Sequence, residues 1–252
     1  MNGVKTRGAT WYLLKGEIKI KFLVLIGLIV VLAIILLLNR KSKLEIINKK
    51  IKIEHLDDSL QSIQFIWIPD IGDIRSKLSE IESICNENTI ILLSGYSKRQ
   101  TKKYNDVNIQ YLSTMAPVYF LWNDQDYRGN YRDLNALLLD CKVTILENTS
   151  ASFETENGTK FTIIGLDDVK TNRDQLSFAL EELYEDSLCI LSSYTEVMDS
   201  NISNFKSIQV YLFERSQSNV KRNQKTVYLE LHNNKGIRKQ NTLTVINFEV
   251  MK

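Results

Sequence analysis

The sequence feature that most constrains the fold is a run of 17 uncharged residues near the N-terminus. Residues 22–38 read FLVLIGLIVVLAIILLL. A helix rises about 1.5 Å per residue, so this run reaches roughly 25 Å, close to the hydrocarbon thickness of a bilayer. Arg40, Lys41 and Lys43 follow it, and Lys19 and Lys21 precede it, so basic side chains can reach the headgroups at both ends. We therefore expect a basic tail over residues 1–21 and a single-pass transmembrane helix over residues 22–39.

A cleaved signal peptide is the alternative interpretation of this run. The run is long for such a peptide, and no small-x-small cleavage pattern follows it, which favours a retained anchor in the cell membrane. Five Lys and Arg residues precede the run, and six lie between Arg40 and Lys52. The positive-inside rule cannot separate five from six. The side of the membrane that holds the rest of the chain stays open.

The charge and the cysteines of the chain after the apolar run argue against nucleic-acid binding and against a cysteine metal site. Residues 53–252 hold 21 Lys and Arg against 28 Asp and Glu, and this acidity disfavours nucleic acid as a partner. Cys85, Cys141 and Cys189 lack metal-ligand spacing and lie in or beside apolar segments. We expect them to be buried free thiols.

The pattern of apolar segments predicts one domain over residues 63–252, after a basic juxtamembrane connector over residues 40–62. Strands are expected at 65–68, 89–93, 118–122, 143–146, 152–154, 161–164, 188–191, 207–213, 226–231 and 242–250, and helices at 75–85, 131–139 and 175–184. Asn157-Gly158 is expected to form a hairpin turn. Mixed β-α-β units and hairpins indicate an α/β fold with two sheets and outer helices, a four-layer αββα sandwich.

One segment suggests both a family and the loss of its chemistry. Residues 118–127 read VYFLWNDQDY. They resemble the V-Y-x-V-x-G-N-H-D-Y segment of calcineurin-like metallophosphoesterases, aligned without a gap. In this alignment Asp124 stands at the asparagine ligand, Gln125 at the catalytic histidine, and Asp126 at the final aspartate.

Four further blocks resemble the family's metal-binding motifs in order, and each has lost ligands. In the first block the aspartate is present as Asp70, and Gly72 stands at the histidine. In the second block Tyr96 stands at the bridging aspartate. Three later histidine positions hold Ser193, Arg215 and Gln217. Residues 163–168, IIGLDD, resemble the family's I-x-G-L-D-D framework. The resemblance covers residues 64–250, and the single-pass anchor is similar to that of membrane-bound bacterial members.

The resemblance implies a fold without its usual centre. The family uses two metal ions to polarise the phosphoryl oxygen and generate hydroxide. With Tyr96 at the bridging position, we expect no two-metal centre, no catalytic residue and no cofactor. Asp70, Asp124 and Asp126 are vestigial candidates for one hard cation such as Mg²⁺, and the alternative is that Asp124 and Asp126 are turn residues. Arg215 is either a surface arginine or a guanidinium that pairs with Asp70 or Asp126.

The sequence thus predicts a membrane-anchored pseudoenzyme that serves as a binding or scaffold subunit for a membrane-associated protein partner. The alternative is an active phosphoesterase of membrane-associated phosphate compounds with an altered metal site. A third possibility is a receptor that holds a phosphorylated ligand without cleaving it. In each case the lipid bilayer is an expected partner.

Overall fold

The computed structural model describes residues 25–32, 45–69, 77–96, 106–181, 183, 188–197, 202, 208–217, 222, 225–231 and 242–251. The chain divides into two compact units, residues 1–43 and residues 44–252. In the first unit, residues 25–32 form an exposed helix. Within the described ranges, no helix is both long and apolar enough to cross a membrane. The two ends of the expected anchor, 22–24 and 33–39, lie outside those ranges.

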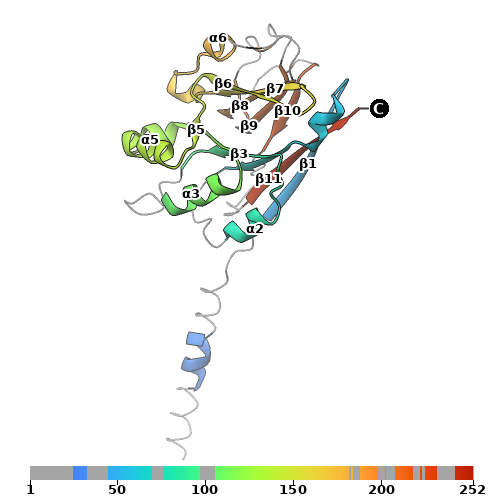
Figure 1. Ribbon diagram of the computed structural model, residues 1–252. Coiled ribbons are helices and arrows are strands. Elements are labelled where there is room, and N and C mark those ends of the chain that lie inside the picture. Colours follow the sequence, from blue (N-terminus) through green and yellow to red (C-terminus); the bar gives the residue numbers. More distant parts are fainter. Residues whose placement is uncertain are drawn as a thin grey trace, which may run out of the picture. The chain divides into compact units, whose positions relative to one another are not determined.

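The second unit contains two mixed sheets. The first sheet has the order β1-β11-β2-β3-β4-β5, in which only β11 and β2 pair antiparallel. Its strands are β1 (Glu45–Ile53), β2 (Gln64–Ile68), β3 (Thr89–Ser94), β4 (Val118–Leu121), β5 (Thr144–Ile145) and β11 (Thr242–Val250). Figure 1 shows β1 and β11 side by side at one end of this sheet.

The second sheet has the order β10-β9-β8-β7-β6, and only β6 and β7 pair antiparallel. Its strands are β6 (Thr149–Glu154), β7 (Lys160–Leu166), β8 (Leu188–Thr195), β9 (Ile208–Arg215) and β10 (Val227–Glu230). The hairpin between β6 and β7 closes where the Thr155 amide donates to the Thr159 carbonyl. Gly158, in the expected Asn-Gly turn, has a φ of 81° there.

The two sheets share a core, because alternate residues of each strand face the other sheet. Phe65 and Leu92 of the first sheet belong to the same buried cluster as Ile163, Ile190 and Leu212 of the second. Burying each such side chain stabilises the fold by about 1.5–3 kcal/mol. The face-to-face packing places the strand ends of both sheets close together.

Helices cover the outer faces of the sheets (Figure 1). The helices are α2 (Leu78–Glu82), α3 (Asp106–Met115), α4 (Asp124–Tyr127), α5 (Tyr131–Asp140) and α6 (Leu176–Ala179), with short 3-10 turns η1 (Asp58–Ser62) and η3 (Val169–Thr171). Apolar residues of α2, α3 and α5 form a cluster with the outer face of the first sheet. Those of α6 form another with the outer face of the second sheet. The α/β class and the two sheets agree with the prediction from the sequence.

Three predicted segments differ from the structure. The expected helix over residues 75–85 is an α-helix only at Leu78–Glu82 and ends in a turn at Ser83 and Ile84, with residues 75 and 76 outside the described part. The expected connector over residues 40–62 contains β1, whose nine residues pair in register with β11, so the second unit begins at Leu44 and not at residue 63. The expected helix over residues 175–184 is helical only at Leu176–Ala179 and continues as a turn at Leu180 and Glu181, with residues 182 and 184 outside the described part. Only Leu176 and Ala179 of α6 are buried, which limits the packing that holds a longer helix.

Candidate site at the carboxyl edge of the two sheets

The carboxyl ends of parallel strands from both sheets converge at one edge. The Ser94 hydroxyl at the end of β3 donates to the buried carboxylate of Glu214 in β9. The Asp124 amide after β4 donates to Asp168 Oδ2 after β7, at 3.0 Å. These two bonds join the sheets at the segments that resemble the metal-binding motifs, so this carboxyl edge is the candidate site.

The turn after β4 is an N-terminal capping box for α4. Asn123 Oδ1 accepts from the amides of Gln125 at 2.8 Å and Asp126 at 3.0 Å. Asp126 Oδ2 in return accepts from the Asn123 amide at 3.1 Å. The same carboxylate reaches the neighbouring strand, because its Oδ1 accepts from the Tyr96 amide at 2.9 Å. Asp126 is buried, and both of its oxygens hold backbone amides.

The loop after β3 approaches this turn so closely that only glycine fits. Gly95 has a φ of +87°, in the left-handed region that glycine enters without penalty. A Cβ at this position would lie 1.8 Å from Asn123 Nδ2. The Gly95 amide also donates to the Leu121 carbonyl at 3.1 Å. Tyr96 follows with its side chain buried in the cluster between the first sheet and its helices.

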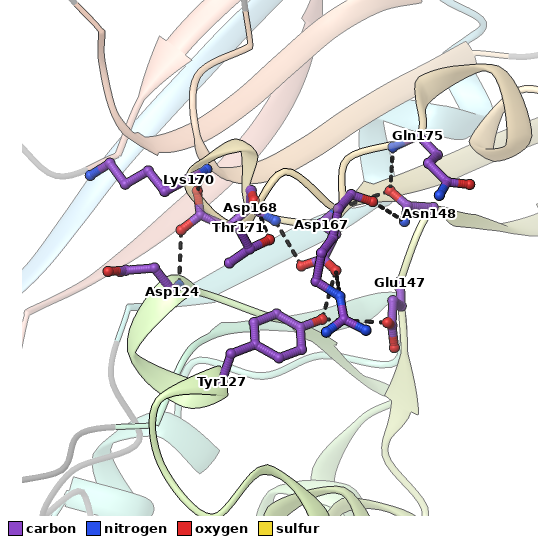
Figure 2. Close-up of polar contacts among 10 residues, drawn as sticks. Asp124, Tyr127, Glu147, Asn148, Asp167, Asp168, Lys170, Thr171 and Gln175 are labelled. Carbon is purple, nitrogen blue, oxygen red and sulfur yellow. Dashed lines mark hydrogen bonds and ion pairs between the residues drawn. The ribbon is translucent and has the colours of Figure 1, made fainter.

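A second group of polar contacts lies after β7, where Asp167 and Asp168 are both fully buried (Figure 2). The Tyr127 hydroxyl of α4 donates to Asp167 Oδ2 at 2.6 Å, and Arg173 Nε lies 3.7 Å from the same oxygen. Burial raises the pKa of Asp167, and the hydrogen bond from Tyr127 opposes that rise. Burial and the Asp167 carboxylate raise the pKa of Tyr127, so this phenol stays protonated.

Asn148 holds the chain after Asp167 in place. It adopts a left-handed conformation with a φ of 55°, which asparagine tolerates better than most residues. Its Oδ1 accepts from the amides of Asp167 at 3.2 Å and Gln175 at 2.9 Å, and its Nδ2 donates to the Arg173 carbonyl at 2.9 Å. Figure 2 shows Asn148 and Gln175 on the far side of Asp167 from Asp124.

The ends of β8 and β9 are joined by a buried glutamate. Glu196 accepts from Arg222 Nε at 2.8 Å and Nη2 at 3.2 Å, a charge-assisted pair that offsets the burial of its carboxylate. Gln217 Nε2 donates to the Glu196 carbonyl at 2.7 Å, and the Gln217 amide donates to Glu196 Oε2 at 3.3 Å. Gln217 therefore links the two strand ends.

Ser193 and Arg215 also make contacts within the protein. The Ser193 hydroxyl donates to the Thr195 carbonyl at 2.8 Å and hydrogen-bonds the Tyr211 hydroxyl at 2.7 Å. The Arg215 guanidinium lies over the ring of Tyr194, 5.1 Å from its centroid. Burial, followed by the nearby Glu214 carboxylate, raises the pKa of Tyr194, and Arg215 opposes that rise.

The structure thus brings most of the sequence-predicted positions to the carboxyl edge. Tyr96, Asp124, Gln125, Asp126, Ser193, Arg215 and Gln217 lie at or just beyond the strand ends there. Gln125 is exposed, and Asp70 and Gly72 lie outside the described residues. A pairing of Arg215 with Asp70 therefore stays a prediction. The other expected partner of Arg215 is Asp126, and both of its carboxylate oxygens accept hydrogen bonds from backbone amides.

Sequence reasoning gave no role to four buried carboxylates at this edge. Asp167, Asp168, Glu196 and Glu214 each follow or end a buried strand. The sequence signal that could have identified them is an acidic residue at or directly after the end of an apolar strand. Their side-chain contacts come from separate parts of the chain, which no local pattern reveals.

The described residues do not fit a metal ion of the kind that the family resemblance implies. Among them, no group of three or more His, Cys, Asp and Glu side chains could hold a metal. Asp124 Oδ2 pairs with Arg128 at 3.1 Å, which leaves only Oδ1, buried and without a hydrogen-bond partner. One such oxygen, with Asp126 committed to backbone amides, falls short of the several oxygen ligands that a hard cation takes.

Comparison with known proteins adds a relative but no activity. No protein-family model matches the chain. Over 97 residues the chain is 30% identical to the uncharacterized protein YpbG of Bacillus subtilis (strain 168). The match covers 38% of this chain and 37% of YpbG. The chain therefore spans little more than a third of the length of that relative.

Proposed function

We propose that this chain is a membrane-anchored pseudoenzyme with a metallophosphoesterase-type αββα sandwich. Its folded unit serves as a binding or scaffold subunit for a membrane-associated protein. Residues 22–39 supply the anchor. The fold is retained for its shape, and hydrolysis is lost.

One observation carries this proposal: the bonding of Asp126. The carboxylate at this motif position accepts from the Tyr96 amide at 2.9 Å and the Asn123 amide at 3.1 Å. It therefore fixes two strand-end loops relative to each other. A carboxylate that ligated a metal would direct at least one oxygen to the ion.

The other replaced positions support the same interpretation. Tyr96, at the bridging position, is buried among apolar side chains. Ser193 is bonded to Tyr211, and Gln217 is bonded to Glu196. Each of these three residues makes an internal contact at a place where the family directs a ligand toward metal.

Elemental analysis and a phosphoesterase assay of the full-length chain, purified in detergent, test the loss of hydrolysis. We expect no stoichiometric Mn, Fe or Zn and no turnover of phosphoesters. The proposal fails if the purified chain carries such a metal and hydrolyses phosphoesters, with the activity lost in Asp70→Ala. That result would establish the altered-site hydrolase instead.

A pull-down tests the scaffold role. The tagged full-length chain should retain one membrane protein at constant stoichiometry from detergent-solubilised membranes. Gly95→Ala, which disrupts the contact between the loops after β3 and β4, is a destabilised control that should retain less of it. Thermal stabilisation by a phosphorylated compound without turnover would point to the receptor alternative.

A further inference from the structure

The longest edge strand of the described part of the folded unit is also its most basic strand. β1 pairs with β11 along one side, and no other strand of the described residues pairs with its second side. Lys49, Lys50 and Lys52 are exposed, and Lys50 shows 68% of its side chain. Successive side chains of a strand point to opposite faces, so these lysines project from both sides of the edge. The three lysines therefore make both faces of this edge strand positively charged.

Charge along the sequence is concentrated at this strand and just before it. Between Arg40 and Lys52 the chain has six Lys and Arg residues and one acidic residue, Glu45. In the folded unit, Glu249 of β11 forms an ion pair with Lys50 at 2.5 Å. The hydrogen bond from Lys50 and the charges of Lys50 and Lys52 lower the pKa of Glu249. Residues 53–252 are net acidic, with 28 Asp and Glu against 21 Lys and Arg. An anionic surface would thus attract β1 and repel most of the rest.

The position of β1 in the chain favours lipid as that anionic surface. Six residues separate Leu38, at the end of the apolar run, from Glu45 at the start of β1. Fully extended, the chain from Leu38 to Glu45 spans at most about 25 Å. Basic residues close to an anionic bilayer are attracted to its headgroups, and the attraction falls off over about 8 Å at physiological ionic strength.

We propose that the open edge of β1, through Lys49, Lys50 and Lys52, lies on the headgroups of anionic phospholipids. The contact orients the folded unit on the bilayer and is made by a strand of the sheet, not by a flexible connector. This inference rests on the membrane anchor in the proposed function. Edge lysines also prevent pairing with foreign strands, and that role needs no lipid.

Lysine labelling of the full-length chain in vesicles tests the contact. The chain is reconstituted into phosphatidylcholine vesicles, with or without phosphatidylglycerol, and treated with an amine-reactive reagent. Lys142, exposed next to β5 at the opposite edge of the same sheet, is the internal reference. In the anionic vesicles, labelling of Lys49 and Lys52 relative to Lys142 should fall about fivefold. At about 1 M ionic strength, where the screening length is roughly 3 Å, this difference should disappear.

A variant pair separates a charge effect from burial. Lys49→Gln together with Lys52→Gln should remove the protection of Lys50 in anionic vesicles. Lys170→Gln, at an exposed lysine after β7, should leave it unchanged. In the wild type, equal labelling of Lys49, Lys50 and Lys52 relative to Lys142 in both kinds of vesicle overturns the inference. Protection that occurs in native membranes but not in pure lipid also overturns it, because a protein would then cover the edge.

Vesicle flotation distinguishes failure of this inference from failure of the anchor. If the full-length chain does not float with vesicles after an alkaline wash, the anchor in the proposed function is wrong. If the chain floats and its β1 lysines label equally in both lipids, only the lipid contact is wrong.

Discussion

Replacing Asp126 with asparagine tests whether this buried carboxylate has a structural role. The side chain keeps its shape in Asp126→Asn, but one of its two oxygens becomes an NH₂ group. An amide can accept from only one of the two backbone donors, Tyr96 and Asn123, that the carboxylate satisfies. The other donor is left facing a second donor in a buried site.

The magnitude follows from these two bonds. Losing a hydrogen bond to a charged group and leaving a buried N–H unsatisfied costs about 2–4 kcal/mol. In a folded unit of this size, that corresponds to a fall in Tm of roughly 5–15 °C. A loss of that size is a large part of the about 5–15 kcal/mol by which a typical domain is stable.

Thermal unfolding of the full-length chain in detergent, followed by circular dichroism, measures the change. Gln125→Ala is the matched control, because Gln125 is the exposed neighbour in the same short helix and should change stability by less than about 0.5 kcal/mol. The structural role is refuted if Asp126→Asn melts within about 2 °C of the wild type. It is also refuted if Mg²⁺ or Mn²⁺ raises the Tm of the wild type but not of this variant, because Asp126 would then be a ligand.

Two further stability predictions follow from the same edge. Gly95→Ala should lower the free energy of unfolding in urea by at least about 3 kcal/mol, because the added Cβ meets Asn123. Gly158→Ala is the control, since Gly158 has a similar φ of +81° but no atom nearer than 3.8 Å to an added Cβ, and it should cost only about 1–2 kcal/mol. Equal losses in the two variants would contradict the steric argument. Since the pKa of Asp167 is raised in the fold, the native state binds the proton more tightly than the unfolded chain. The wild type should therefore lose stability relative to Asp167→Asn as the pH rises above about 3.9, and a pH-independent difference would contradict the shift.

Periodicity predicted the central strands β2 and β3 and their neighbour β11 well because most of their residues are buried. The expected strand over residues 242–250 matches β11 (Thr242–Val250) residue for residue, and β2 (Gln64–Ile68) and β3 (Thr89–Ser94) differ by one residue each. Buried strands have continuous apolar runs that end sharply at polar residues. The α/β class and the two-sheet arrangement could therefore be inferred from the sequence.

β1 was missed for a physical reason. Its sequence EIINKKIKI has isoleucines that alternate with lysines, as in a half-buried strand, but its partner β11 lies almost 200 residues later in the chain. No local pattern reveals a pairing of that range. The basic residues also fitted a connector next to the apolar run equally well.

At the candidate site, the resemblance indicates which positions differ from the family's ligand motifs, but it does not show what contacts the residues at those positions make. The alignment with the family motif places Tyr96 at the position of the bridging aspartate. Asp126 accepts a hydrogen bond from the Tyr96 amide, and Asp167 accepts one from the Tyr127 hydroxyl. Both bonds depend on loops that the packing of the two sheets brings together. Such contacts follow from tertiary structure alone.

The pairing of β1 also determines how the folded unit bears mechanical load. All nine residues of β1 pair in parallel with β11, from Glu45 opposite Thr242 to Ile53 opposite Val250. A pull on the chain at Glu45 directed along the strand acts in shear, so the ladder bonds resist together and do not open one at a time. Tension transmitted through residue 44 would therefore meet the sheet at a strong point of attachment before it reached the loops of the candidate site.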